Sequence, residues 1–297
     1  MPKKITPFVA LITCFNPDES INQTAVLKQV RRQVDAGNNI LFCGTNGDFT
    51  SMTFSEKVDL CAAVVSEVKG KALVFANAGC PSTYETLLLG KEFIKAGVEA
   101  IAVITPYFID CTQEGLYAHY CRLADSLEKP VYMYDIPPRT QNHIEPETAA
   151  RLATHPNIKG MKDSGGVKET LDVFLDIGRD NPGFDVFVGP DLLIHYALSR
   201  GASGCISGLG NIAPRLVNSI CTAHAEGDMA AAEAAQTKLA ELRKRLFALG
   251  YAPAVTKRAL YLSDPTVGAS RSPALQADAA LDSKIAEILC DLDIAAA

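Results

Sequence analysis

Short apolar runs recur along the first three-quarters of the chain and predict β-strands. The runs are nearly continuous rather than alternating, and they are rich in valine, isoleucine, phenylalanine and tyrosine. Runs of this kind are typical of strands that are buried on both faces, as in a parallel sheet. The pattern predicts eight strands, at residues 8–13, 40–43, 72–76, 100–105, 131–134, 158–162, 186–189 and 204–207.

The stretches between these runs have the period of amphipathic helices. Apolar residues recur at three- and four-residue spacing in segments 24–36 and 55–68. Ser82 and Glu85 have the spacing of a capping box at the start of a third helix, and Pro146 favours the first turn of a later one. Three helix ends are followed by a glycine that can adopt the left-handed C′ conformation. These glycines are Gly37, Gly97 and Gly201.

The regular alternation of strand, helix and glycine predicts an α/β protein with the fold of a (β/α)8 TIM barrel. A doubly wound open sheet is the alternative, although the glycine fingerprint of its dinucleotide-binding form is absent. The pattern changes at residue 223, because 223–248 is rich in alanine, glutamate, lysine and leucine. We therefore predict a catalytic barrel at 1–222 and a C-terminal helical extension at 223–297.

Composition and charge exclude several classes of partner. The chain has 297 residues, of which 48% are hydrophobic, and its formal net charge of -6 argues against nucleic acid. No apolar run approaches the roughly 18 residues of a membrane span, and no signal peptide is evident, so we expect a cytoplasmic protein. The nine cysteines form no C-x-x-C pair and the five histidines are scattered. We therefore expect reduced cysteines, no metal and no cofactor.

Candidate chemistry gathers where the predicted strands end, which is where the site of a (β/α)8 enzyme forms. Thr45, Asn46 and Gly47 follow the second strand, and their hydroxyl, amide and backbone N–H groups suit a carboxylate or phosphate. The fourth strand is followed by Tyr107, and Arg139 lies shortly after the fifth. An anion cradle, a phenol and a guanidinium are therefore expected on one rim.

Two further side chains end the fifth and sixth strands, Tyr134 and Lys162. A lysine that is desolvated at a strand end has a lowered pKa, and only the neutral amine attacks a carbonyl. Lys162 is therefore a candidate Schiff-base lysine, and a solvent-exposed loop lysine is the plainer alternative. Asp135 and Asp163 follow these two residues, and we expect them to be structural rather than catalytic.

Taken together, these residues and their surrounding motifs resemble the dihydrodipicolinate synthase / N-acetylneuraminate lyase family of class I aldolases, over essentially the full length of the chain. The resemblance is specific for the family and much less so for a substrate. The motifs that carry it are Gly44-Thr45-Asn46-Gly47-Asp48, Tyr134-Asp135-Ile136-Pro137-Pro138-Arg139-Thr140, Gly160-Met161-Lys162-Asp163, Gly204-Cys205-Ile206-Ser207 and Gly210-Asn211-Ile212-Ala213-Pro214.

The resemblance implies a role for each matching residue. Lys162 corresponds to the lysine that condenses with pyruvate or another 2-oxo acid, and Tyr134 to the phenol that shuttles protons. Thr45 and Asn46, with Gly47, correspond to the cradle for the 2-oxo acid carboxylate. Ile206 lies where the backbone of the family lines the pyruvate pocket. The resemblance also implies a homotetramer.

Departures from the family pattern leave the reaction open. A second tyrosine that relays protons to a neighbouring subunit in the synthases is Phe108 here, while Tyr107 is retained. Arg139, by contrast, corresponds to the arginine that holds the carboxylate of aspartate semialdehyde. Our first hypothesis is a lyase that forms or uses pyruvate, acting on a 2-keto-3-deoxy sugar acid or 4-hydroxy-2-oxoglutarate. The alternatives are a dihydrodipicolinate synthase and a non-catalytic protein that binds a 2-oxo acid.

Overall fold

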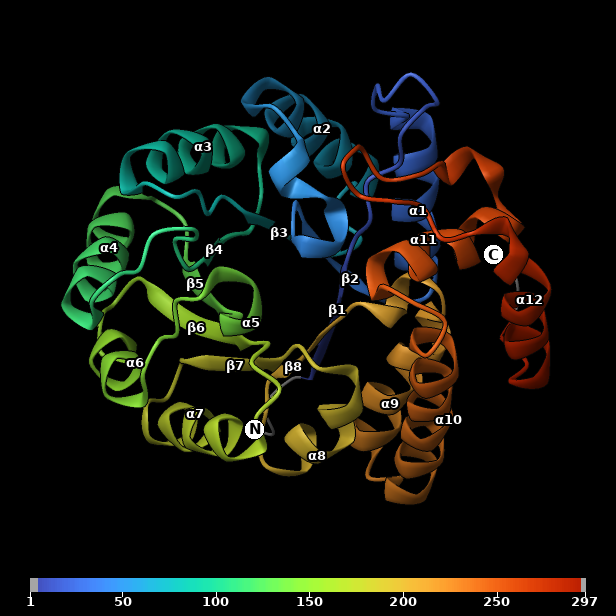
Figure 1. Cartoon of the computed structure of the whole chain (residues 1–297). Helices are drawn as coiled ribbons and strands as arrows, with labels where there is room; N and C mark the ends of the chain where they lie inside the picture. Colours follow the sequence, from blue (N-terminus) through green and yellow to red (C-terminus); the bar gives the residue numbers. More distant parts are fainter. Residues whose placement is uncertain (1–4, 295–297) are drawn as a thin grey trace.

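Eight parallel strands form a closed barrel in the computed structural model, which describes residues 5–294. Each strand pairs with the next along the chain, and the last pairs with the first (Figure 1). The TIM-barrel prediction is confirmed, and the open-sheet alternative is wrong. The strands are β1 (Thr6–Ala10), β2 (Asn39–Phe42), β3 (Val74–Asn77), β4 (Ala100–Ile104), β5 (Val131–Asp135), β6 (Ile158–Asp163), β7 (Asp185–Val188) and β8 (Gly204–Ser207).

Helices follow the strands and cover the outside of the barrel. The helices expected at 24–36, 55–68 and 82–96 are present with ends shifted by one residue at most. The helices as far as the last strand are α1 (Gln23–Asp35), α2 (Phe54–Val68), α3 (Thr83–Ala96), α4 (Gln113–Ser126), α5 (Pro137–Thr140), α6 (Pro146–Ala153), α7 (Lys168–Asp180) and α8 (Ile194–Ser199). Those beyond it are α9 (Pro214–Glu226), α10 (Met229–Phe247), α11 (Ala252–Ser263) and α12 (Asp282–Asp291).

Local capping signals set several of these helix ends. The Ser82 hydroxyl accepts a hydrogen bond from the backbone N–H of Glu85, which is one half of the expected capping box. The complete box lies at the start of α2, where Thr53 and Glu56 bond to each other's backbone. The glycines that follow α1, α3 and α8 have positive φ angles, as expected for C′ residues.

The first strand ends earlier than its apolar run. The pattern predicts a strand at 8–13, but β1 ends at Ala10. Beyond that point the Ile12 N–H donates to the Asn211 side chain at 3.1 Å, and the Thr13 hydroxyl donates to the Gly47 carbonyl at 2.7 Å. Side chains and loops thus replace the strand ladder, and they tie the start of the chain to the loops at the ends of β2 and β8.

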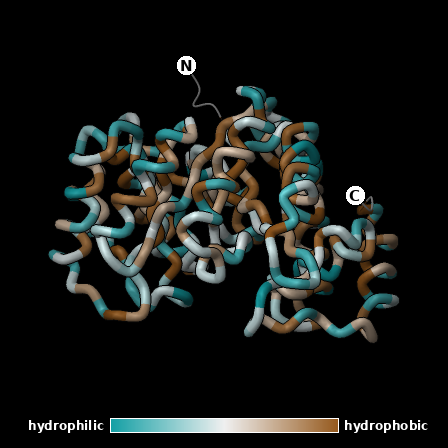
Figure 2. Tube along the Cα trace, turned by 90° about the horizontal axis from the view of Figure 1, so that it is seen from above, coloured by the Kyte–Doolittle hydropathy of each residue, from teal (hydrophilic) through white to brown (hydrophobic). Residues whose placement is uncertain are grey.

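The barrel encloses a small core of its own. Phe8 and Phe75 lie with ring centroids 4.5 Å apart, and Phe187 packs edge-on against Phe8 at 5.5 Å. A larger apolar layer fills the space between the strands and the surrounding helices. The hydropathy-coloured trace shows hydrophobic positions along the inner segments and hydrophilic ones on many outer turns (Figure 2).

The C-terminal helices lie together on one flank of the barrel, with α12 outermost (Figure 1). The boundary expected between residues 222 and 223 falls inside α9, which ends at Glu226 and is followed by Gly227 with φ +81°. The 223–248 stretch is therefore not one helix, because it is interrupted after Glu226, between α9 and α10. A division into barrel and extension stays a proposal, and the helix end at Gly227 is its natural place. None of the helices in residues 5–294 is long and apolar enough to span a membrane.

Candidate active site

Tyr134 and Lys162 are neighbours across β5 and β6, where they are direct register partners. The next partner of Lys162, on β7, is Phe187, whose ring belongs to the core inside the barrel. Both side chains therefore face the barrel interior, since alternate residues of a strand face opposite sides. Lys162 is 6% exposed, and its Nζ lies 4.0 Å from the centroid of the Tyr134 ring. The lysine is buried, as the Schiff-base hypothesis requires.

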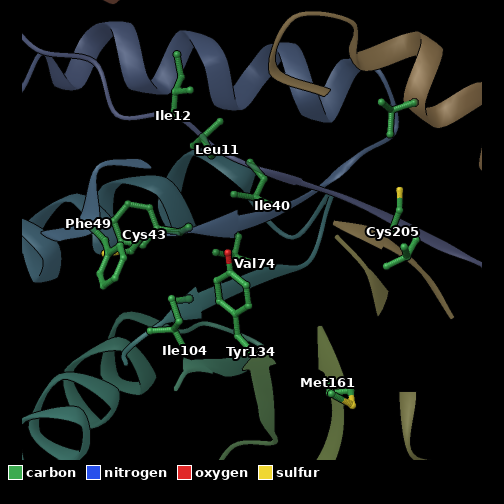
Figure 3. Close-up of a cluster of buried hydrophobic side chains, with 14 of the residues drawn as sticks. Leu11, Ile12, Ile40, Cys43, Phe49, Val74, Ile104, Tyr134, Met161 and Cys205 are labelled. Carbon is green, nitrogen blue, oxygen red and sulfur yellow. The ribbon is translucent and has the colours of Figure 1, made fainter. Parts of the chain in front are cut away.

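The Tyr134 hydroxyl is bound by a residue from another strand end. It lies 3.0 Å from the Thr45 hydroxyl, and either oxygen can be the donor. Thr45 begins the short 3-10 helix η1 (Thr45–Gly47), directly after β2. Figure 3 shows the Tyr134 phenol among buried side chains, with its hydroxyl directed away from its own strand. The structure thus brings Thr45, Tyr134 and Lys162 together in a connected group.

Close approach of backbone explains why η1 carries a glycine. A Cβ added at Gly47 would lie 2.9 Å from the Leu11 carbonyl oxygen, which is too close for a side chain there. Asn46 meets the loop after β8, because a Cβ at Gly208 would lie 3.2 Å from its amide nitrogen. The segment predicted to form an anion cradle is thus a tight turn between the loops that follow β2 and β8.

A cavity of about 440 Å³ opens beside this group. Thr45 is part of its wall, together with Tyr107 and Arg139, whereas Tyr134 and Lys162 are absent from the wall as far as the described residues show. Tyr107 packs edge-on against Phe49 with ring centroids 5.8 Å apart, and burial raises the pKa of its phenol. Thr45 therefore joins the buried amine and phenol to a space that a small molecule could enter.

The C-terminal segment supplies the other side of this cavity, which the sequence pattern did not indicate. The Arg139 guanidinium lies 5.3 Å from the centroid of the Tyr251 ring, at the start of α11. Ser270 and Leu275 also line the cavity, and Leu275 is exposed. No local motif marks these residues, because they reach the site only through the packing of the extension on the barrel.

An ion pair fastens this segment to the barrel. Lys257 of α11 is almost completely buried and contacts the Asp48 carboxylate, which also accepts a hydrogen bond from the Ser270 hydroxyl at 3.1 Å. Burial lowers the pKa of Lys257, and the charge of Asp48 opposes that shift. Asp48, which directly follows η1, therefore links this turn to the C-terminal wall of the cavity.

The side chains of Ile206 and its neighbour Ser207 point to opposite faces of β8. The Ile206 side chain is buried in the core inside the barrel, opposite Phe8, which leaves its backbone as the part that could meet a ligand. The Ser207 hydroxyl donates to the buried Asp191 carboxylate, whose pKa is raised by burial. Asp191, in the 3-10 helix η3 (Asp191–Leu193), was not among the expected site residues, and the positive charge of Lys162 acts on it.

Asp135 and Asp163 are register partners on the outward face of β5 and β6. The Asp135 carboxylate accepts from the Ile144 N–H at 3.0 Å and lies 2.7 Å from His143 Nδ1, which raises the pKa of that histidine. Burial raises the pKa of Asp163 to about 6. These positions, turned away from Lys162, agree with the structural role expected for both aspartates.

Phe108 lies on the surface between β4 and α4. Its side chain is 86% exposed and its φ is +78°, a left-handed conformation that is rare for a bulky residue. It supplies no hydroxyl to the group formed by Thr45, Tyr134 and Lys162. Among the described residues, no cluster of three or more histidine, cysteine or acidic side chains is placed to hold a metal ion.

The closed barrel with a buried lysine, a phenol and a hydroxyl at its strand ends defines the class, a (β/α)8 enzyme of the lyase type. The chain matches the Dihydrodipicolinate synthetase family over residues 3–291. It is 36% identical over 276 residues to the 4-hydroxy-tetrahydrodipicolinate synthase of Corynebacterium aurimucosum, which covers 91% of this chain and 89% of that one.

Solved structures agree with this match. A dihydrodipicolinate synthase variant described as the first monomeric one has a TM-score of 0.93 and 28% identity, and covers 99% of this chain and 98% of its own. The enzyme of Acinetobacter baumannii complexed with pyruvate has a TM-score of 0.92 and 28% identity, with 98% and 99% covered. The chain therefore belongs to the dihydrodipicolinate synthetase family.

Proposed function

We propose that the protein is a class I aldolase that forms an imine between Lys162 and the ketone of pyruvate. The observation that carries the proposal is the connected group of a buried amine, a phenol and a hydroxyl. Lys162 lies 4.0 Å from the Tyr134 ring centroid, and the Tyr134 hydroxyl lies 3.0 Å from that of Thr45. The pyruvate complex of a solved relative also supports pyruvate as the donor.

The neutral Lys162 amine attacks the ketone carbon of pyruvate, and the carbinolamine that forms loses water to give the imine. The protonated imine accepts the electron pair when the methyl carbon loses a proton, and the resulting enamine attacks an aldehyde. Cleavage of a 2-oxo acid is the reverse sequence. The Tyr134 hydroxyl donates and accepts these protons, and Thr45 passes them toward the cavity.

The carboxylate of the 2-oxo acid binds at η1. Its Thr45 hydroxyl, the Asn46 amide and the backbone N–H groups of these two residues form an anion cradle, and the Gly47 N–H holds the turn by donating to the Gly44 carbonyl at 3.0 Å. Arg139, on the cavity wall, then faces the aldehyde partner together with Tyr107. An aldehyde that carries a carboxylate suits a guanidinium at this position, because arginine binds carboxylates with two parallel hydrogen bonds.

Two reactions remain candidates for this site. Phe108 favours a lyase acting on a 2-keto-3-deoxy sugar acid or 4-hydroxy-2-oxoglutarate, because it lacks the hydroxyl expected of a synthase. Arg139 and the names of the relatives favour 4-hydroxy-tetrahydrodipicolinate synthase. Incubation with pyruvate and aspartate semialdehyde, with the cyclised product followed by mass spectrometry, separates the two. Pyruvate release from 4-hydroxy-2-oxoglutarate or a 2-keto-3-deoxy sugar acid supports the first.

Borohydride reduction in the presence of pyruvate tests the imine itself. We expect mass spectrometry to find a reduced pyruvate adduct on Lys162 and none in Lys162→Ala. Lys159→Ala is the matched control, because this lysine lies on the same strand with its side chain exposed, and it should keep the adduct. An unmodified Lys162 would contradict the proposal and favour a non-catalytic protein that binds a 2-oxo acid.

We also propose that the protein acts in the cytoplasm, without a cofactor, as a homotetramer. Large apolar side chains near the starts of α3 and α4 support an interface there, since Tyr84 is 67% exposed and Ile109 is 65% exposed, beside Phe108. One solved relative is described as a monomeric variant, so the mass of the assembly in solution tests this proposal.

A further inference from the structure

A second cavity, of about 770 Å³, lies on the flank of the barrel among α1, the start of α9, α10 and the residues that follow α12. Figure 1 shows α1, α9 and α10 on this flank, with α12 outside them. The residues of its wall are different from those of the candidate active-site cavity. The geometry and charge of this cavity point to a binding site for a small anion that carries a phosphate or carboxylate group.

Positive charge is concentrated on the wall of this cavity. Its acidic residues are Asp35 and Asp293. Its basic residues are Lys28, Arg31, Arg32, Arg215 and Lys238. The chain as a whole carries a net charge of -6, so this excess of basic residues is a local feature. A concave surface with one sign of charge concentrates ions of the opposite sign.

Some of these charges already have partners and others do not. Lys28 lies 2.9 Å from the Asp264 carboxylate, and Arg31 lies 3.0 Å from that of Glu67. Arg215 is exposed, near the N-terminus of α9, and forms no ion pair within residues 5–294. The free N–H groups of that helix turn favour an anion as well.

Arg32 is the basic residue of this wall that gives the strongest support for a bound anion. Its guanidinium is half-buried and donates to two backbone carbonyls, those of Asn211 and Ile212. It has no carboxylate partner in the described part of the chain, and burial lowers its pKa to about 10. A partly buried cation without a counter-ion is less favourable than a paired one, and an anion bound in the cavity would supply the missing negative charge.

Gln29 supplies an independent observation. The residue is part of the cavity wall but is only 1% exposed. Its amide nitrogen Nε2 finds no acceptor among the residues that the structure describes. A buried N–H without an acceptor is costly. Because Nε2 is shielded from solvent, a small shift of the side chain toward the cavity would let an oxygen atom of a bound anion accept from it. Amide and guanidinium donors on one wall match the acceptor oxygens of phosphate and carboxylate groups.

Isothermal titration at constant ionic strength, with inorganic phosphate and malonate as probes, tests the site. We expect saturable binding of at least one probe, with a Kd that is weakened about tenfold or more in the double variant Arg215→Gln/Lys238→Gln. Both side chains lie at the surface of the cavity, so the variant should fold. Arg139→Gln, which alters the other cavity, should keep the Kd of the wild type.

Gln29→Met separates ligand binding from a purely structural role. Removal of an unpaired buried amide should leave the melting temperature unchanged or raised, yet weaken the binding of the same probe. Absence of binding for both probes, an unchanged Kd in the double variant, or loss of binding in Arg139→Gln alone would overturn the inference. Binding of phosphate without malonate would assign the site to phosphate-bearing ligands, and binding of both to small anions in general.

Discussion

At the residue scale, Tyr134 connects the buried Lys162 amine to Thr45. Its ring lies against Lys162, while its hydroxyl contacts Thr45. The ring and the hydroxyl therefore have separable roles, because removal of the hydroxyl leaves the packing around the lysine in place.

Tyr134→Phe should lower kcat by about 10²–10⁴-fold, since proton transfer by a positioned side chain contributes on that scale. Steady-state kinetics measures the loss. Tyr107→Phe is the matched control, because that phenol lies on the cavity wall without a bond to Thr45 and should change kcat far less. Equal rates for wild type and Tyr134→Phe would rule out proton transfer by this phenol.

Asp163 should make stability depend on pH in an unusual direction. Its pKa is about 6 in the fold, against an ordinary value of 3.8, so the folded state binds more protons between these values. Stability should therefore fall as pH rises from 4 to 6 and stay lowered above it, by roughly 2–3 kcal/mol at most. Asp163→Asn, which cannot ionise, should lack this contribution. Urea unfolding across the pH range compares the two proteins, and parallel curves would contradict the assignment.

At the element scale, the C-terminal segment is attached to the barrel by contacts between residues that are far apart in the sequence. Lys257 and Asp48 are 209 residues apart in sequence and meet beneath the cavity. The ion pair joins α11 to the end of η1, and Ser270 adds a hydrogen bond to the same carboxylate. The C-terminal wall of the cavity and the turn at η1 are therefore held by the same carboxylate.

Lys257→Met should destabilise the fold by about 3–5 kcal/mol, because it leaves Asp48 largely buried without its counter-charge. The double variant Asp48→Asn/Lys257→Met should recover much of this loss, since neither charge then remains unpaired. Chemical unfolding of the four proteins completes a double-mutant cycle. Independent effects of the two substitutions would show that the pair contributes little.

At the scale of the whole molecule, Phe108 exposes 86% of its apolar side chain, and its backbone is in a left-handed conformation. The exposed ring and the positive φ angle both raise the free energy of an isolated folded chain. An interface with a second copy would cover the ring and explain why the conformation is kept.

Light scattering after size-exclusion chromatography should give four times the chain mass of 31.8 kDa. Phe108→Asp should shift the protein toward smaller species, because it places a charge in an apolar interface. Leu275→Asp is the matched control, since that residue is also highly exposed but lies on the C-terminal segment. A wild type that elutes as a single chain would end the proposal of a tetramer.

The order of the elements could be predicted from the sequence because its signals are local. Buried parallel strands produce continuous apolar runs, and glycine follows helix ends where φ is positive, as at Gly97. The barrel and the positions of Thr45, Tyr134 and Lys162 at its strand ends follow from these signals. The roles assigned to those residues stay predictions.

Tertiary structure alone decided the features that depend on distant contacts. Asn211 takes over the hydrogen bonds beyond β1, Tyr251 comes to lie against Arg139, and burial raises the pKa of Asp163. The unpaired amide of Gln29 is visible only once α1 has packed against its neighbours. None of these has a local signature, because burial and pairing are set by segments that are far apart in the chain and meet only on folding.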